Sequence, residues 1–362
     1  MGASDMPTFT NGARYSEQRS DRVPVLEIRG LCVDYGLGSE ALHAVLEADL
    51  VLHRGEVLGL AGESGSGKST LVYAATRLLR EPGVITAGEV RLHSAREGHS
   101  TGVVDLLDLN ERELRQLRWS EISVVLQSAL NALNPVVRIE KEFEDVLKAH
   151  RPDLSRAERR VRAAELLTMV GISADRLGDH PHQLSGGQRQ RVMIALALAL
   201  EPQVVIMDEP TTALDVVTQR EILEELASLR ERLGFALLFI THDLSLLIEL
   251  ADEIAVMYAG RLVERAPARV LYWSPRHPYT HGLLNSFPPM QGDVHPMTGI
   301  PGSPPDLRAV PSGCPFHPRC RYAMEKCTTE VPQLVALEDS RREVACWLHS
   351  AEAPVPEELS VQ

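Results

Sequence analysis

The chain has 362 residues, 44% of them hydrophobic, which is enough for about two domains with full cores and argues against wholesale disorder. Its 37 Lys and Arg against 50 Asp and Glu give a formal charge of −13, which argues against a general nucleic-acid binder. No apolar run approaches the ~18–20 residues that cross a bilayer, and the polar start lacks the apolar core of a secretion signal. We expect a soluble intracellular protein with a disordered tail at 1–23 and a short tail at 351–362.

Four short apolar runs between residues 24 and 270 alternate with helix-like stretches, a pattern typical of a parallel sheet wrapped by helices. Each run ends in polar residues. Because ligands of open α/β sheets bind at the carboxyl ends of the strands, we expect these polar groups to meet at one edge. The runs are Val57–Ala61 before Gly62, Ile122–Leu126 before Gln127, Val204–Met207 before Asp208, and Leu237–Thr241 before His242.

The segment after the first run, GESGSGKS, fits the pattern G-x-x-x-x-G-K-[ST]. Its glycines let successive N–H groups point at phosphate oxygens, and the following helix adds its positive end. Lys68 is expected to reach the β- and γ-phosphates, and the Ser69 hydroxyl to ligate Mg²⁺. The predicted nucleotide-binding residues are Gly62, Ser64, Gly65, Ser66, Gly67, Lys68, Ser69 and Thr70.

Two adjacent carboxylates follow the third apolar run. Asp208 is expected to bind Mg²⁺, directly or through water, because a hard cation prefers oxygen ligands. Glu209 is placed to take a proton from the attacking water. Together with the phosphate loop, this pair predicts hydrolysis of a nucleoside triphosphate.

A mainly helical insertion is predicted at about 128–183, and the sequence LSGGQ follows it at 184–188. Ser185, Gly186 and Gly187 offer a hydroxyl and N–H groups where a helix begins, which is a second anion-binding device. One triphosphate does not need both devices from one chain.

Taken together, these motifs resemble the ATP-binding-cassette (ABC) ATPases over about residues 25–270, in the same order. The resemblance implies an α/β P-loop NTPase cassette with a RecA-like core, an N-terminal antiparallel β subdomain and an inserted helical subdomain. It also implies that two subunits sandwich ATP, each giving its phosphate loop to one site and its LSGGQ to the other.

The resemblance assigns further roles by position. Gln127 would contact Mg²⁺ and the attacking water and sense a membrane partner, and His242 would contact the γ-phosphate. Asp215 would cross the dimer seam. Tyr35 would stack on adenine, with a core tyrosine at a strand edge as the alternative. The LSGGQ residues expected at the nucleotide are Ser185, Gly186, Gly187 and Gln188.

Composition changes near residue 270, and 11 of the 23 prolines fall between Pro275 and Pro318. Proline excludes regular helix or central strand over most of that stretch. We therefore predict a separate C-terminal module at 271–350. Its sequences RHPYTHGLLNSFP, IPGSPPDL and GCPFHPRCRYAMEKC resemble the C-terminal extension of ATPases that energise oligopeptide and dipeptide permeases and their nickel-importing relatives.

Four of the five cysteines lie in this module, at Cys314, Cys320, Cys327 and Cys346. In a reducing compartment such a cluster suggests a metal before disulfides. Three interpretations stay open: a [4Fe–4S] cluster, as in some members of the family that the module resembles; structural zinc, which usually has tighter pairs; or unligated core cysteines.

The resemblance predicts an importer ATPase for peptides or a related small solute, at the cytoplasmic face of the membrane. Its partners would be a homologous ATPase subunit, with a heterodimer favoured, two permease subunits and an extracytoplasmic binding protein. Two alternatives are a soluble cassette ATPase acting on nucleic acid or ribosomes, and a non-catalytic cassette. The acidic balance opposes the first, and intact Lys68, Asp208, Glu209 and His242 oppose the second.

Overall fold

The computed structural model describes residues 22–36, 38, 41–94, 102–126, 132–212, 214–286, 299–337, 341–350, 356 and 359. The predicted tail at 1–23 therefore lies outside the described residues except for its last two positions, and most of the tail at 351–362 also lies outside them. Among the described residues, no helix is both long and apolar enough to cross a membrane.

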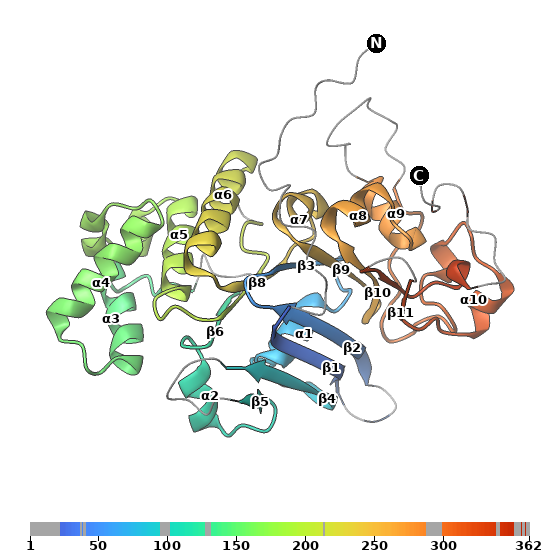
Figure 1. The fold of residues 1–362 in the computed structure, drawn as a ribbon, viewed down its shortest axis with the longest axis horizontal. Helices are drawn as coiled ribbons and strands as arrows, with labels where there is room; N and C mark the ends of the chain where they lie inside the picture. Colours follow the sequence, from blue (N-terminus) through green and yellow to red (C-terminus); the bar gives the residue numbers. More distant parts are fainter. Residues whose placement is uncertain are drawn as a thin grey trace, which may run out of the picture.

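The described chain forms two sheets (Figure 1). The smaller is antiparallel, with strand order β2-β1-β4-β5. The larger has the order β11-β12-β10-β9-β3-β8-β7-β6, and its pairs from β9 to β6 are parallel. The smaller sheet contains β1 (Pro24–Tyr35), β2 (Leu42–His53), β4 (Gly83–His93) and β5 (Val103–Asp105). The larger contains β3 (Val57–Ala61), β6 (Ile122–Val125), β7 (Val204–Asp208), β8 (Ala236–Ile240), β9 (Glu253–Tyr258), β10 (Arg261–Pro267), β11 (Val335–Ala336) and β12 (Glu343–Val344).

The central strands β3, β7 and β8 are buried along their whole length, because both faces of the large sheet are covered. Helix α1 (Lys68–Ala75) packs between the two sheets, and its Leu71 and Val72 belong to the same hydrophobic cluster as Leu58 and Leu60 of β3. The opposite face of the sheet carries Val57 and packs against α6 (Val216–Leu233) and α7 (Leu244–Leu250). This arrangement confirms the predicted mixed α/β architecture with an antiparallel β subdomain.

The stretch predicted to be a helical insertion contains α3 (Ile139–His150) and α4 (Arg156–Met169), followed by two short 3₁₀ turns (Ala174–Gly178 and Pro181–Gln183) and then α5 (Gly186–Ala197). Ser155 caps α4, and Glu158 completes the capping box. We call α3, α4 and the two turns the helical lobe. It lies at one end of the molecule in Figure 1.

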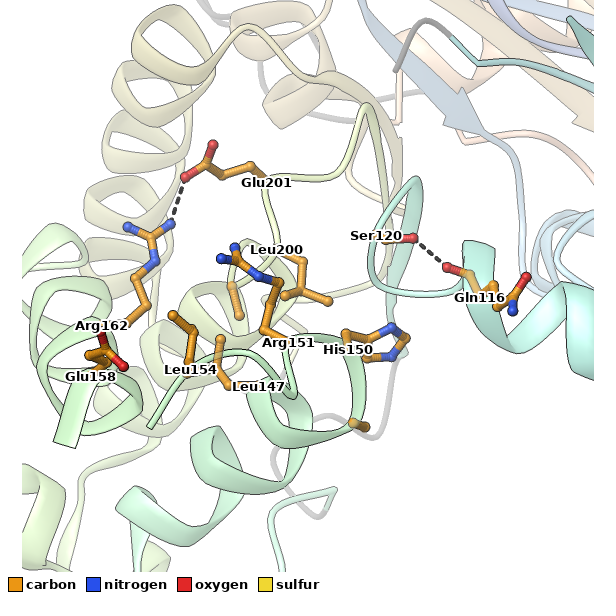
Figure 2. A pocket seen from close by; sticks show the side chains of 12 residues that line it. Gln116, Ser120, Leu147, His150, Arg151, Leu154, Glu158, Arg162, Leu200 and Glu201 are labelled. Atoms are coloured by element: carbon orange, nitrogen blue, oxygen red, sulfur yellow. Dashed lines mark hydrogen bonds and ion pairs between the residues drawn. The ribbon is translucent and has the colours of Figure 1, made fainter. Parts of the chain in front are cut away.

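A cleft of about 900 Å³ separates the helical lobe from the segments that follow α2 (Glu111–Leu117) and α5 (Figure 2). Leu147, Leu154 and Leu200 give it an apolar part. Arg162 reaches Glu201 across it, with 2.7 Å between Nη2 and Oε1. The cleft contains none of the predicted nucleotide-binding residues.

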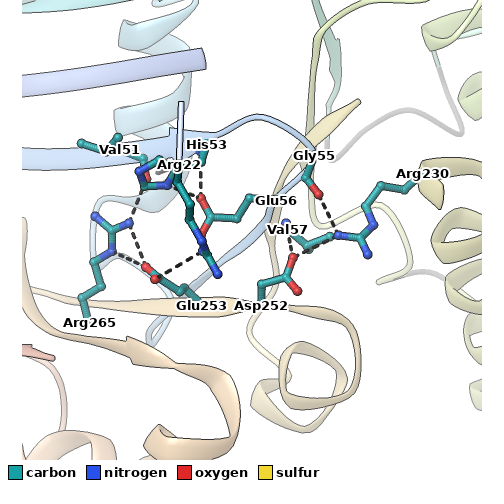
Figure 3. A network of polar contacts seen from close by, with 10 residues as sticks. All are labelled: Arg22, Val51, His53, Gly55, Glu56, Val57, Arg230, Asp252, Glu253 and Arg265. Carbon is teal, nitrogen blue, oxygen red and sulfur yellow. Dashed lines mark hydrogen bonds and ion pairs between the residues drawn. The ribbon is translucent and has the colours of Figure 1, made fainter. Parts of the chain in front are cut away.

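A buried ion-pair network joins the two sheets at the amino end of β3, opposite the predicted nucleotide site (Figure 3). Arg265 donates to Glu253 Oε2 at 2.9–3.0 Å and to the carbonyl of Val51 in β2 at 2.9 Å. Both charged side chains are almost fully buried, so removing either one would leave the other as an unpaired buried charge. Nearby, Asp252 accepts from the Val57 N–H at 2.8 Å.

Residues beyond 270 continue both the sheet and the core. Strand β12 pairs with β10, and Tyr279 and Phe316 belong to the main hydrophobic cluster. The short helices here are α8 (Ala268–Trp273), α9 (Pro278–Leu284) and α10 (Glu325–Thr329), with 3₁₀ turns at His317–Arg319 and Trp347–His349. The C-terminal module therefore packs against β9 and β10, and β9 is the neighbour of β3 in the sheet.

Candidate functional site: a phosphate loop with two carboxylates

The phosphate loop connects β3 to α1, and its glycines are required by close backbone contacts. A Cβ on Gly62, which has φ 146°, would lie 2.3 Å from the Met257 carbonyl oxygen. A Cβ on Gly67, with φ 104°, would lie 2.4 Å from the Ala44 carbonyl oxygen. Gly67 is also the N-cap of α1 and supplies no side-chain cap. The helix therefore begins with backbone N–H groups suited to an anion.

Lys68 is the buried cation of this loop, with 5% of its surface exposed. Its Nζ donates to the carbonyl oxygens of Gly62 at 2.8 Å and Glu63 at 3.0 Å, and to Ser66 Oγ at 3.3 Å. Burial lowers the pKa of Lys68, while the nearby carboxylates of Glu209, Asp208 and Glu63 oppose that shift. The ammonium group is thus held by neutral oxygens and directed into the loop.

Asp208, at the end of β7, lies beside the phosphate loop. Its Oδ1 accepts from the Ser69 hydroxyl at 3.1 Å. Burial raises the pKa of Asp208, while the hydrogen bond from Ser69 lowers it. Its Oδ2 is buried and meets no hydrogen-bond donor among the described residues. A buried carboxylate oxygen without a donor, next to a hydroxyl, fits a hard divalent cation such as Mg²⁺.

Glu209 follows Asp208 in a left-handed backbone conformation, with φ 46°. This conformation is costly for a residue with a side chain, and it is fixed here by the hydrogen bond from the Glu209 N–H to the Ile240 carbonyl at 2.9 Å. The carboxylate accepts from Thr212 Oγ1 at 3.1 Å and lies 3.5 Å from His242 Nδ1. Glu209 and His242 therefore share one edge of the sheet with Lys68 and Asp208.

Tyr35 lies beside the same loop, because its hydroxyl is 3.3 Å from Thr70 Oγ1. The remaining loop residues, Ser64, Gly65 and Ser66, complete the turn, and Gly65 has φ 79°. Gln127 lies outside the described residues, so the structure does not place it.

The LSGGQ residues lie elsewhere in the chain, at the start of α5. Ser185 is the N-cap and exchanges hydrogen bonds with Gln188, at 3.2 Å from the Gln188 N–H to Ser185 Oγ and 3.0 Å from the Ser185 N–H to Gln188 Oε1. A Cβ on Gly187 would lie 2.6 Å from Thr218 Cγ2, and Gly186 packs near Leu214. Asp215 caps α6 by accepting from Thr218. This helix start, predicted to bind a second anion, lies beside α6, whereas α1 lies under β3 (Figure 1).

The four clustered cysteines line one small cavity with the buried His277 and Phe316. Burial raises the pKa of Cys314 to about 11 and that of Cys346 to about 12, and the neighbouring thiols raise both. Burial also lowers the pKa of His277 to about 3, so its ring is neutral. Among the described residues, no three His, Cys, Asp or Glu side chains form a group that could hold a metal ion. The cysteines that line this cavity are Cys314, Cys320, Cys327 and Cys346.

Several residues at the site were not predicted from the sequence. Burial, together with the nearby charge of Asp208, raises the pKa of Tyr73 to about 12, so the phenol stays protonated. Its position four residues after Ser69 places both on one face of α1, which is a signal in the sequence. Thr212 lies only three residues after Glu209, so its contact with Glu209 could also have been expected from the local sequence. Glu63 and its partner Arg319 are far apart in the sequence, and no local pattern links them.

The fold and this site define the class of the protein as an ABC-type ATPase. Residues 45–212 match the ABC transporter family, and residues 263–327 match the oligopeptide/dipeptide transporter C-terminal region. A cassette solved as a dimer in a post-hydrolysis state with ADP and Pi is 31% identical, with a TM-score of 0.58, over 67% of this chain and 99% of that one.

Full-length relatives extend the match over both parts of the chain. The dipeptide transport ATP-binding protein DppD of Caldanaerobacter subterraneus is 41% identical over 91% of this chain and 99% of its own length. A putative peptide import ATP-binding protein of Brucella melitensis is 43% identical over 87% and 95%. The chain belongs to the family of ABC transporter ATP-binding subunits that carry the oligopeptide/dipeptide C-terminal region.

Proposed function

We propose that this chain hydrolyses MgATP to energise the import of oligopeptides, dipeptides or a related small solute. The observation that carries the proposal is the shared edge of the sheet, where Lys68, Asp208 and Glu209 lie around one phosphate loop. The peptide class is supported by the names of the relatives and by the matched C-terminal region. The chain would act at the cytoplasmic face of the membrane, without entering it.

Within this proposal, the phosphate loop cradles the triphosphate and Lys68 contacts its β- and γ-phosphates. Ser69, Asp208 and Gln127 would hold Mg²⁺, which neutralises charge on the phosphates. Glu209 acts as the general base toward the attacking water, and His242 contacts the γ-phosphate. Tyr35 stacks on the adenine ring. The roles of Lys68, Ser69, Asp208 and Glu209 are supported by the side chains that border the loop, whereas those of Gln127, His242 and Tyr35 are assigned by resemblance.

The LSGGQ segment, the second predicted anion-binding segment, would need a second chain to reach an ATP phosphate. Ser185, Gly186, Gly187 and Gln188 lie beside α6 and not at the phosphate loop of their own chain. We propose that they complete the ATP site of a partner cassette, with Asp215 at the seam. Contacts to the γ-phosphate from both chains would each contribute about 1.5–3 kcal/mol, so hydrolysis weakens the closed dimer. A homologous subunit is the favoured partner, giving a heterodimer.

We place the contact with the two permease subunits at the cleft of Figure 2. Its partly exposed Leu154 and Leu200, together with its charged lining residues, suit a protein segment that is partly apolar. An extracytoplasmic binding protein would deliver the solute to these permease subunits.

Co-purification from detergent extracts tests this function. We expect both permease subunits to accompany the wild-type chain, and Leu154→Glu to reduce their recovery at least about fivefold while ATP hydrolysis by the isolated chain persists. Val161→Glu, on the exposed face of α4 outside the cleft, is the matched control. Recovery of ribosomes or nucleic acid in place of membrane proteins would contradict the proposal.

We further propose that the four-cysteine cavity holds a [4Fe–4S] cluster with a structural or sensing role. The proposal is supported by the resemblance of the module and by the four thiols that line one cavity; at about 10 Å³ this cavity has room for about one water, so the thiols must move apart to admit a cluster. As they stand, no three His, Cys, Asp or Glu side chains of the described residues are grouped so as to hold a metal ion. A cubane cluster differs from a single ion because each thiolate binds its own iron corner. The thiols must lose their protons to bind, so loading is expected to release protons.

Anaerobic purification checks the cluster. The protein should be brown, with about four iron and four acid-labile sulfide ions per chain. Cys320→Ser should lower the iron content, whereas Cys32→Ser should not, because Cys32 lies in β1 and is not among the residues that line the cavity. A colourless protein with one zinc ion would refute the cluster.

A further inference from the structure

The C-terminal module holds both the backbone and the side chain of Glu63, the second residue of the phosphate loop. The Glu63 N–H donates to the Tyr279 hydroxyl oxygen at 2.7 Å. Arg319 donates from Nη1 and Nη2 to the two Glu63 carboxylate oxygens, at 2.7 and 3.0 Å. A bidentate pair of this kind fixes direction as well as distance.

Arg319 is itself held in place by the module and by Tyr258, the last residue of β9. Its Nε donates to the Pro301 carbonyl at 2.8 Å, and its Nη1 donates to the Tyr258 hydroxyl oxygen at 3.3 Å. Its guanidinium carbon lies 5.8 and 5.9 Å from the ring centres of Tyr258 and Phe316. Only 7% of the Arg319 side chain is exposed, against 25% for Glu63. The guanidinium is therefore pre-organised and meets Glu63 without a large loss of side-chain freedom.

Glu63 in turn contacts the groups that meet phosphate. Its carbonyl oxygen accepts from Lys68 Nζ at 3.0 Å and from the Ser66 N–H at 3.2 Å. A displaced Glu63 would therefore displace an oxygen that holds Lys68. In addition, an unbalanced carboxylate at this position would repel a triphosphate, and Arg319 balances its charge.

We propose that Arg319 and Tyr279 are positioning residues for ATP. Acting through Glu63, they hold the phosphate loop in its anion-binding shape and neutralise the Glu63 carboxylate. The inference rests on ATP binding at the phosphate loop, and it makes the C-terminal module part of the nucleotide site.

Steady-state ATP hydrolysis and the dissociation constant for MgATP, measured on the full chain, test this role. We expect Arg319→Ala to raise KM and Kd for MgATP about tenfold or more, with kcat changed by less than about threefold. The double variant Glu63→Gln with Arg319→Ala should recover most of the lost affinity, because no uncompensated carboxylate remains. A purely structural loss would not be rescued by the second substitution.

Two further variants sharpen the test. Tyr279→Phe keeps the ring and removes only the acceptor of the Glu63 N–H, so Kd should rise by about threefold to tenfold even if Arg319→Ala folds poorly. Arg321→Ala is the matched control, since Arg321 is in the same module and lies over the Tyr322 ring, 4.8 Å from its centre. Wild-type affinity in Arg319→Ala or Tyr279→Phe, or a double variant as weak as Arg319→Ala alone, would overturn the inference. Failure of wild type and Arg321→Ala to bind MgATP would instead refute the proposed ATP site.

Discussion

Replacing Glu209 by Gln should lower kcat by about 10²–10⁴ while the affinity for MgATP stays within about threefold of wild type. The amide has nearly the same shape and still accepts a hydrogen bond from Thr212, so the left-handed turn at Glu209 is retained. What is lost is the carboxylate that can take a proton from water. ATP should then persist in the site.

The measurement combines single-turnover hydrolysis with size-exclusion chromatography in MgATP. The variant is expected to accumulate an ATP-bound dimer, because the ligand that closes it is no longer destroyed. Glu224→Gln, an exposed glutamate in α6, is the matched control and should hydrolyse ATP normally. Unchanged turnover in Glu209→Gln would remove Glu209 from the base role.

Replacing Lys68 by Ala should weaken MgATP binding at least about 100-fold and abolish hydrolysis. Lys68 donates only to neutral oxygens in the described structure, so its charge is available for phosphate. Losing two charge-assisted hydrogen bonds of about 1.5–3 kcal/mol each accounts for an effect of this size. The variant also leaves the Asp208 and Glu209 carboxylates without their nearby cation.

Calorimetric titration with MgATP measures the effect, and Lys148→Ala, an exposed lysine of α3, is its control. Because burial lowers the pKa of Lys68, wild-type affinity should begin to fall at a lower pH than an ordinary lysine would allow. Above its pKa the amine is neutral, so affinity decreases as pH rises. Normal affinity in Lys68→Ala would contradict the assignment of the phosphate loop.

The sheet and the residues at its edge were largely predictable from local sequence. Strand β3 has the predicted bounds, β6 and β7 differ from the predicted runs by one residue at one end, and β8 is shifted by one residue at both ends. Buried strands read as continuous apolar runs, so their ends are visible without any tertiary information. The meeting of Lys68, Asp208, Glu209 and His242 at one edge then follows from the topology of a parallel sheet, while Gln127 lies outside the described residues.

The contacts of Glu63 were not predictable in this way. Arg319 is 256 positions later, and the two meet only because the C-terminal module folds back over β9 and the loop. The cysteine spacing placed four thiols in one region but carried no information on whether they surround a cavity or converge on one point. Both properties depend on the tertiary path through a proline-rich stretch, where neither helical nor strand periodicity applies.

The ion pair between Glu63 and Arg319 also bears on how such chains evolve. In most phosphate loops the residue after the first glycine is free to vary, but here its charge is matched by a cation from another region. A homologue in which the arginine is replaced keeps an unpaired carboxylate beside its ATP site. Substitutions at position 63 should therefore accompany substitutions at position 319. A gene fusion or deletion that exchanges this C-terminal region should preserve activity only when the residue at position 63 of the phosphate loop is compatible with the new region.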